Sequence, residues 1–118
     1  MTPARATLRV KNPAEAVRFY GQVLGFDVLV FDDRRARVEL PGLDLQLLRE
    51  DREQSEKVFG AGAARHRPGV GVELRLVVDD PAVFAERVTT RGGFLVTSTP
   101  EAVTVRDGDG YVLTFERA

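Results

Sequence analysis

The chain of 118 residues contains no cysteine and no tryptophan, and only one histidine and one methionine. Without cysteine it has neither a disulfide framework nor thiolate chemistry. Neither sign of charge is in large excess, since 17 Lys and Arg residues offset 18 Asp and Glu residues to leave a net charge of −1. Such a balance gives no electrostatic reason to expect nucleic acid or an anionic membrane as a partner.

Long apolar runs are also absent. No stretch approaches the roughly 20 apolar residues that cross a bilayer, and the first ten residues, MTPARATLRV, lack the apolar core of a signal peptide. A cytoplasmic protein is therefore expected. Apolar residues make up 43% and charged residues 30% of the chain, which is typical of a soluble globular protein. The length predicts a single domain spanning residues 1–118.

The chain uses one pattern twice. Residues 12–28 read NPAEAVRFYGQVLGFDV, and residues 80–96, at an offset of 68, read DPAVFAERVTTRGGFLV. Seven identities at this offset indicate an internal duplication. The matched pairs are Pro13 and Pro81, Ala14 and Ala82, Gly25 and Gly93, Phe26 and Phe94, Val28 and Val96, and upstream Leu8 and Leu76, and Val10 and Val78.

Each copy of the pattern predicts a capped helix. Asn12 and Asp80 are good N-caps, and the proline after each occupies the first helical position, where its missing N–H is not needed. Apolar residues then recur at helical spacing. Glycine readily adopts the left-handed conformation that ends a helix, so Gly25 and Gly93 are the predicted ends. The predicted helices cover residues 13–24 and 81–91.

Strand signals surround both helices. Residues 5–10 alternate apolar and polar side chains, as a strand with one buried face does. Similar segments predict two βαβββ modules, residues 5–50 and 73–118, joined by a linker at 51–72. The further predicted strands are residues 26–31, 35–40, 43–48, 73–78, 94–98, 102–106 and 111–116.

The linker begins with charged residues and becomes rich in glycine and alanine, which favours a mobile connection. A short helix over residues 52–59 is compatible with its first half. Val58 and Phe59 form an apolar pair that either packs on the domain edge or closes as a lid over a pocket. His66 lies between two arginines, and no carboxylate nearby in sequence orients it, so a solvated loop residue is favoured over a catalyst.

Residues 107–110, DGDG, resemble the start of a calcium loop. An EF-hand needs an oxygen ligand where Tyr111 stands and a glutamate where Ala118 stands, so a tight hairpin turn is predicted instead.

The segment AVRFY at residues 16–20, the LGF at 24–26 and the DGDGY at 107–111 together resemble the glyoxalase / bleomycin resistance / extradiol dioxygenase superfamily, the vicinal oxygen chelate group. This resemblance implies an α+β fold in which two tandem βαβββ modules form a curved, cup-like mixed sheet with the helices outside.

The resemblance also implies where a metal would bind. Metal-using members place His or Glu on the first and last strands of each module, and those positions match Arg5, Gln46, Glu73 and Thr114 here. Only Glu73 is a good ligand, and an arginine opposes a metal's charge. We therefore expect no metal, no cofactor and no catalytic residue, as in the metal-free members that sequester an antibiotic in clefts of a homodimer.

Strand alternation predicts which side chains line the cup. Apolar walls with a few convergent polar groups suit a small-molecule ligand, and an apolar lip at residues 29 and 31 favours a homodimer. The candidate ligand contacts are Thr7, Arg9, Leu29, Phe31, Gln46, Leu48, Phe59, Glu73, Arg75 and Thr114.

Three alternatives stay open. The first is a metal-dependent lyase, isomerase or dioxygenase that uses a rearranged set such as Glu73, Glu116 and His66. The second is a protein-interaction module whose cup is filled by its own side chains. In the third, the charged residues neutralise one another across an empty face.

Overall fold

The computed structural model describes residues 3–62, 67–69 and 71–118, although not the side chains of 52–55. Its elements, in order, are β1 (Ala4–Val10), α1 (Pro13–Val17), η1 (Arg18–Val23), β2 (Asp27–Phe31), β3 (Arg35–Leu40), β4 (Leu43–Arg49), α2 (Arg52–Phe59), β5 (Glu73–Val78), α3 (Ala82–Arg91), β6 (Phe94–Ser98), β7 (Ala102–Arg106) and β8 (Val112–Arg117). Within the described residues, no helix is long and apolar enough to span a membrane.

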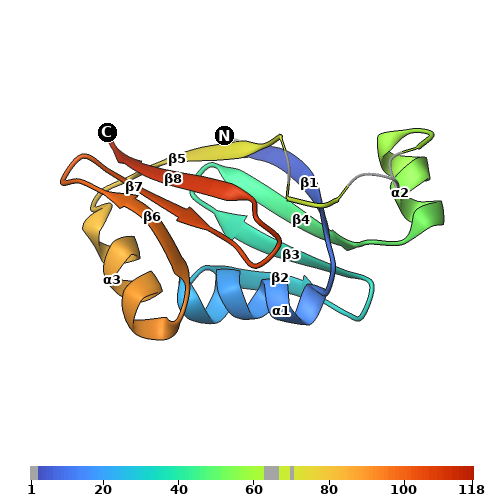
Figure 1. Cartoon of the computed structure of the whole chain (residues 1–118), viewed down its shortest axis with the longest axis horizontal. Helices are drawn as coiled ribbons and strands as arrows, with labels where there is room; N and C mark the ends of the chain where they lie inside the picture. Colours follow the sequence, from blue (N-terminus) through green and yellow to red (C-terminus); the bar gives the residue numbers. More distant parts are fainter. Residues whose placement is uncertain (1–2, 63–66, 70) are drawn as a thin grey trace.

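The eight strands form two sheets of the same design. Their orders are β1-β4-β3-β2 and β5-β8-β7-β6, with a parallel first pair and antiparallel pairs after it. The helices α1 and α3 lie along one side of the molecule, below the strands in Figure 1. The predicted α+β fold with two βαβββ units is confirmed.

The constant sequence offset hides two compensating insertions. Leu8 pairs with Leu47, and Leu76 with Phe115, an offset of 68. The pair Val28–Val38 instead corresponds to Leu95–Val105, an offset of 67. One extra residue enters the first module at η1, a π-helix that continues α1 and whose Leu24 N–H donates to Phe19 C=O at 2.9 Å.

The matching insertion in the second module lies between β7 and β8. Four residues separate the paired Glu39 and Asp44, but five separate the equivalent pair, Arg106 and Val112. The prediction that Gly93 ends the second helix is wrong, because the extra residue in η1 changes the offset between the modules from 68 to 67 at this point. Gly92 ends it, with a φ of 86°, as Gly25 does after η1. The backbone shift leaves Gly93 packed against Val88 and Phe19.

A β-bulge reverses another prediction. The pairing of β2 with β3 shifts between Val28 and Val30, so Leu29 is an extra residue in β2. Phe31 therefore pairs with the buried Ala36 and lies on the helix side of the sheet. Strand alternation had placed Phe31 on the opposite, cup side, and that assignment is wrong.

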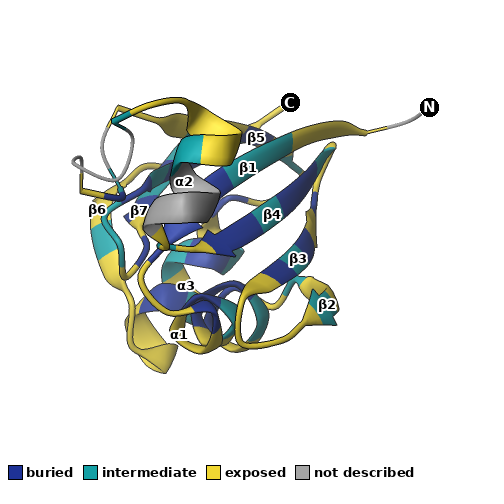
Figure 2. Cartoon of the chain, turned by 90° about the vertical axis from the view of Figure 1, so that its right-hand side faces the viewer, coloured by how far each residue is buried: buried dark blue, intermediate teal, exposed yellow. Residues whose placement is uncertain are grey.

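The hydrophobic core is shared by the two modules. Figure 2 shows buried residues alternating with more exposed ones along β3, and the buried ones, such as Ala36 and Val38, belong to the hydrophobic core. Phe84 of α3 stacks on Phe115 of β8 with ring centroids 4.1 Å apart, and Phe26 of the first module lies 5.5 Å from Phe84. Aromatic stacking therefore connects residues from both halves of the chain.

Asp107 forms a polar connection between the modules. Its Oδ1 accepts hydrogen bonds from the backbone N–H groups of residues 109, 110 and 111, each at 2.9 Å. Its Oδ2 accepts one from the Tyr20 hydroxyl of η1 at 2.7 Å. The Tyr111 hydroxyl in turn donates to the Arg9 carbonyl at 2.8 Å. The DGDGY segment is a turn, as predicted, and also binds the first module.

The linker contains the helix that the sequence allowed at α2, which projects from the end of the molecule opposite α3 (Figure 1). Val58 and Phe59 are 48% and 43% exposed, so they do not pack on the domain edge. His66 and the prediction made for it lie outside the described residues. Two described residues of the linker pack on the domain, since Pro68 is buried and Gly69 lies against the turn between β7 and β8.

Gly69→Ala is expected to destabilise the protein by about 2 kcal/mol or more. Gly69 has a φ of 87°, and a Cβ there would overlap the carbonyl oxygen of Asp109. Gly60→Ala is the matched control, because Gly60 has a φ of 98° but no atom within 4 Å of the added Cβ. Urea unfolding measures both variants. Equal losses of stability would show that the contact with Asp109 contributes nothing.

Candidate functional site

Each sheet leaves the face opposite the helices open. Face A, on the first sheet, consists of Arg5, Thr7, Arg37, Asp44 and Gln46, whose strands pair Thr7 with Gln46 and Gln46 with Arg37. The Asp44 carboxylate lies 2.6 Å from the Arg37 guanidinium and 3.7 Å from that of Arg5. The hydrogen bond from Arg37 is the main cause that lowers the pKa of Asp44, so the carboxylate is ionised at neutral pH.

Face B, on the second sheet, consists of Glu73, Arg75, Thr104, Thr114 and Glu116. The Arg75 guanidinium lies 3.0 Å from Glu73 and 3.3 Å from Glu116. The second oxygen of Glu73 accepts a hydrogen bond from the Thr114 hydroxyl at 3.2 Å, and that hydroxyl also lies 3.0 Å from the hydroxyl of Thr104. These contacts fix the orientation of both threonines.

The two faces carry inverted charge patterns. On face A the Asp44 carboxylate lies between two guanidinium groups, with Glu39 opposite it in the strand register, and on face B the Arg75 guanidinium lies between two carboxylates. Within each face, oppositely charged side chains therefore pair with one another, as the third alternative from the sequence expects. The groups of face B stay accessible, since the side chains of Arg75 and Glu73 are 55% and 44% exposed, whereas the Asp44 side chain on face A is only 11% exposed.

The structure brings most of the predicted contacts onto these faces. Thr7 and Gln46 lie half-buried on face A, and Arg9 and Leu48 extend the same strands but are each only 8% exposed. Leu29 is 48% exposed at the bulge. Glu73 and Arg75 are exposed on face B, where Thr114 is buried. Phe31 and Phe59 lie on neither face.

Arg37 and Thr104 were missed by the sequence reasoning. Arg37 pairs across strands with Asp44, which lies on the neighbouring strand. The alternation of β3, which places Ala36 and Val38 in the core, was the signal that could have assigned Arg37 to the open face.

The residues at the implied metal positions do not fit a metal ion. Arg5 carries a positive charge, Gln46 and Thr114 are neutral and weak ligands, and Glu73 is paired with Arg75. Across the described residues, no group of three or more His, Cys, Asp or Glu side chains is placed to hold an ion. The rearranged set including His66 reaches beyond the described residues.

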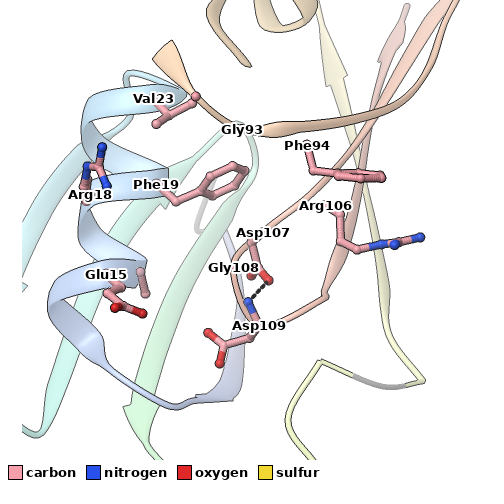
Figure 3. Close-up of a pocket in the computed structure, with 12 residues that line it drawn as sticks. Glu15, Arg18, Phe19, Val23, Gly93, Phe94, Arg106, Asp107, Gly108 and Asp109 are labelled. Atoms are coloured by element: carbon pink, nitrogen blue, oxygen red, sulfur yellow. Dashed lines mark hydrogen bonds between the residues drawn. The ribbon is translucent and has the colours of Figure 1, made fainter. Parts of the chain in front are cut away.

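A second concave region lies where the modules meet. This junction groove, of about 320 Å³, separates α1 and η1 from the ends of β6 and β7 (Figure 3). Neither strand alternation nor motif spacing predicted it, because its walls come from opposite halves of the chain. It is lined by Glu15, Ala16, Arg18, Phe19, Val23, Gly92, Gly93, Phe94, Arg106, Asp107, Gly108 and Asp109.

Solved structures share this fold at low sequence identity. TnmS3, an antibiotic-binding protein from Streptomyces sp. CB03234, is 22% identical, with a TM-score of 0.69 over 99% of this chain and 95% of that one. TioX from Micromonospora sp. ML1 is 20% identical, with a TM-score of 0.72 over 99% and 98%. The lactoylglutathione lyase from Agrobacterium tumefaciens is 16% identical, with a TM-score of 0.71 over 99% and 93%.

At these identities the similarity establishes the fold and not the activity. A search of curated proteins finds no match. A family model, however, matches residues 2–115, nearly the whole chain. With its two βαβββ units, this chain belongs to the Glyoxalase/Bleomycin resistance protein/Dioxygenase superfamily.

Proposed function

We propose that the protein binds a small aromatic or antibiotic-like molecule, without transforming it, in a cup completed by a second copy of the chain. The observation that carries this proposal is the pair of open sheet faces with accessible polar groups. Large apolar side chains are exposed as well, Val77 at 57% next to Glu116 on face B and Leu29 at 48% at the bulge of β2. Polar groups that orient a ligand among apolar contacts are typical of small-molecule sites.

The inverted charge patterns support a homodimer in which face A of one chain lies opposite face B of its partner. In this arrangement the guanidinium groups of one chain face carboxylates of the other, whereas two identical faces would bring like charges together. The exposed Leu29 and Val77 also lose contact with water. Sedimentation at micromolar concentration tests this arrangement. A dimer has twice the chain mass of 13.0 kDa, and a purely monomeric species would contradict the proposed cup.

Binding without catalysis is favoured by the side chains at the implied metal positions. TnmS3 binds an antibiotic and the Agrobacterium protein is a lyase, so the shared fold is compatible with both functions. In this chain Arg5 opposes a metal's charge and Glu73 is held by Arg75 and Thr114. Metal analysis of protein purified without chelator tests this choice. One stoichiometric nickel, zinc or iron per chain would favour the enzyme instead.

A thermal-shift screen over natural-product antibiotics is the direct test of ligand binding. A ligand at a hundred times its dissociation constant stabilises the folded state by about 2.7 kcal/mol, which raises the melting temperature by roughly 10 °C for a domain of this size. Failure of every aromatic compound in such a library to shift the melting temperature would argue against the proposal.

Glu73→Gln is expected to weaken binding of a hit by about three- to tenfold, because a charged hydrogen-bond acceptor and its ion pair with Arg75 are lost. Gln46→Ala tests face A in the same titration. The matched control is Glu86→Gln, which removes an exposed glutamate from α3 on the helix side. If binding is unchanged in both face variants, or is equally weakened by the control, the ligand does not occupy the cup.

A further inference from the structure

The two one-residue insertions that distinguish the modules both lie at the junction groove. The extra residue of the first module lies in η1, whose Arg18, Phe19 and Val23 line the groove. The extra residue of the second module lies in the turn after β7, whose Asp107 to Asp109 segment forms the facing wall. Both departures from the duplicated pattern therefore shape a single concavity. Local π-helical geometry is often associated with functional sites.

The inner surface of the groove is apolar and aromatic. Ala16, Phe19 and Val23 are buried side chains of α1 and η1 and form the floor. Phe94 lines the rim of the groove and is 57% exposed; it pairs with Arg106, whose guanidinium lies 5.1 Å from its ring centroid, on the face B side of the sheet. An aromatic ring exposed to this extent, with one face stacked by an arginine, leaves its remaining surface available to a ligand.

Charged groups in the groove are arranged unequally. Figure 3 shows the carboxylates of Glu15 and Asp109 at the same end of the groove on opposite walls, whereas the Arg106 side chain extends away from the helix. Arg18 also lines the groove, one helical turn further along from Glu15. The Glu15 carboxylate makes no hydrogen bond or ion pair with the described part of the chain, and the Asp109 carboxylate accepts one from the Lys11 backbone N–H at 2.9 Å. Burial is the main cause that raises the pKa of Asp109, and the negative charge of Glu15 raises it further.

Asp107 does not compete for a ligand in this groove. Its two oxygens are occupied by Tyr20 and by three backbone N–H groups. The unsatisfied acceptor capacity at the groove therefore belongs to Glu15 and Asp109. Two carboxylates beside an aromatic floor attract a positive charge attached to an apolar body.

We propose that the junction groove is a second binding site, separate from the cup, that takes a small organic cation. The ammonium or guanidinium group of the ligand lies between Glu15 and Asp109, and its aromatic or aliphatic body lies against Phe19 and reaches the rim at Phe94. The volume of about 320 Å³ is at the lower end of the range for ligand pockets, which limits the ligand to roughly one ring with a short arm. This site does not depend on the proposed function of the open faces.

The test is an amide-shift NMR titration of the full 15N-labelled chain with 2-phenylethylamine, which is cationic at pH 7. Saturable shifts are expected at Gly92, Gly93 and Gly108, which line the groove. The neutral isostere 2-phenylethanol is expected to bind at least about fivefold more weakly, because it lacks the charge that two carboxylates attract. Equal binding of the two compounds, or no saturation with the amine below about 10 mM, would overturn the proposal.

Glu15→Gln and Asp109→Asn assign the site to its carboxylates. Each is expected to weaken amine binding by about three- to fivefold. Both variants keep the fold, since Glu15 is exposed and the side-chain amide oxygen introduced by Asp109→Asn still accepts from the Lys11 N–H. Glu86→Gln, on the exposed surface of α3, is the control for the loss of one negative charge. Unchanged affinity in both groove variants would show that the groove only separates the two modules.

Discussion

Asp107→Ala is expected to lower the free energy of unfolding by about 3–5 kcal/mol, since hydrogen bonds to charged groups contribute about 1.5–3 kcal/mol each and turn donors regain some water. The carboxylate is only 7% exposed and accepts from Tyr20 and from three backbone N–H groups. At about 4 °C per kcal/mol for a domain of this size, the melting temperature falls by roughly 12–20 °C. Thermal and urea unfolding measure both quantities.

Two variants separate the role of Asp107 from a general effect of the turn. Asp109→Ala removes one hydrogen bond, from Lys11, and is expected to lose about 1 kcal/mol. Asp107→Asn keeps an oxygen for the three backbone donors and is expected to lose less than Asp107→Ala. A loss below about 1 kcal/mol in Asp107→Ala would mean that the connection to Tyr20 does not stabilise the fold.

Phe115→Ala is the second variant with a large expected effect, a loss of about 3–5 kcal/mol for a fully buried phenylalanine. The ring stacks on Phe84 at 4.1 Å and lies 6.1 Å from Phe26, so its removal leaves a cavity between residues of both modules. Because this core is shared, we expect urea unfolding to remain a single transition in which the two modules unfold together.

Phe94→Ala is the matched control for Phe115→Ala. Phe94 belongs to the same sheet and loses the same atoms, but it is 57% exposed, so a loss within about 1 kcal/mol is expected. Two separate transitions in Phe115→Ala, one for each module, would contradict the shared core. An equal loss of stability in the two phenylalanine variants would contradict the burial argument.

Local pattern was sufficient to predict the architecture of this chain. Pro13 after its N-cap Asn12, the alternation in strands such as β3 and β7, and the helix α2 all depend on neighbours within a few residues, whereas Pro81 is itself the N-cap of α3, which begins at Ala82. Backbone hydrogen bonding and burial act on those neighbours directly, which is why the order of elements follows from the sequence. The duplication and the three short motifs also identified the superfamily to which the chain belongs.

The side of the sheet on which an individual side chain lies was less predictable. Strand alternation has a period of two, so one inserted residue moves every later side chain to the other face. The bulge at Leu29 did this to Phe31, which was assigned to the cup and lies on the helix side. Gly93 was taken as the equivalent of Gly25 because a later insertion in the turn after β7 restores the offset of 68. A pair of compensating insertions is invisible to a gapless match.

The sequence by itself determined two βαβββ units, the Asn12 cap of the first helix, and polar side chains such as Gln46 and Thr114 at the positions where metal-using relatives carry ligands. Only the tertiary structure decided that Asp107 binds Tyr20, 87 residues away, and that Glu15 and Asp109 share one groove. The physical reason is that these contacts join elements from opposite halves of the chain. Their geometry follows from how α1, η1 and β7 pack on a common core, and no local propensity encodes that packing.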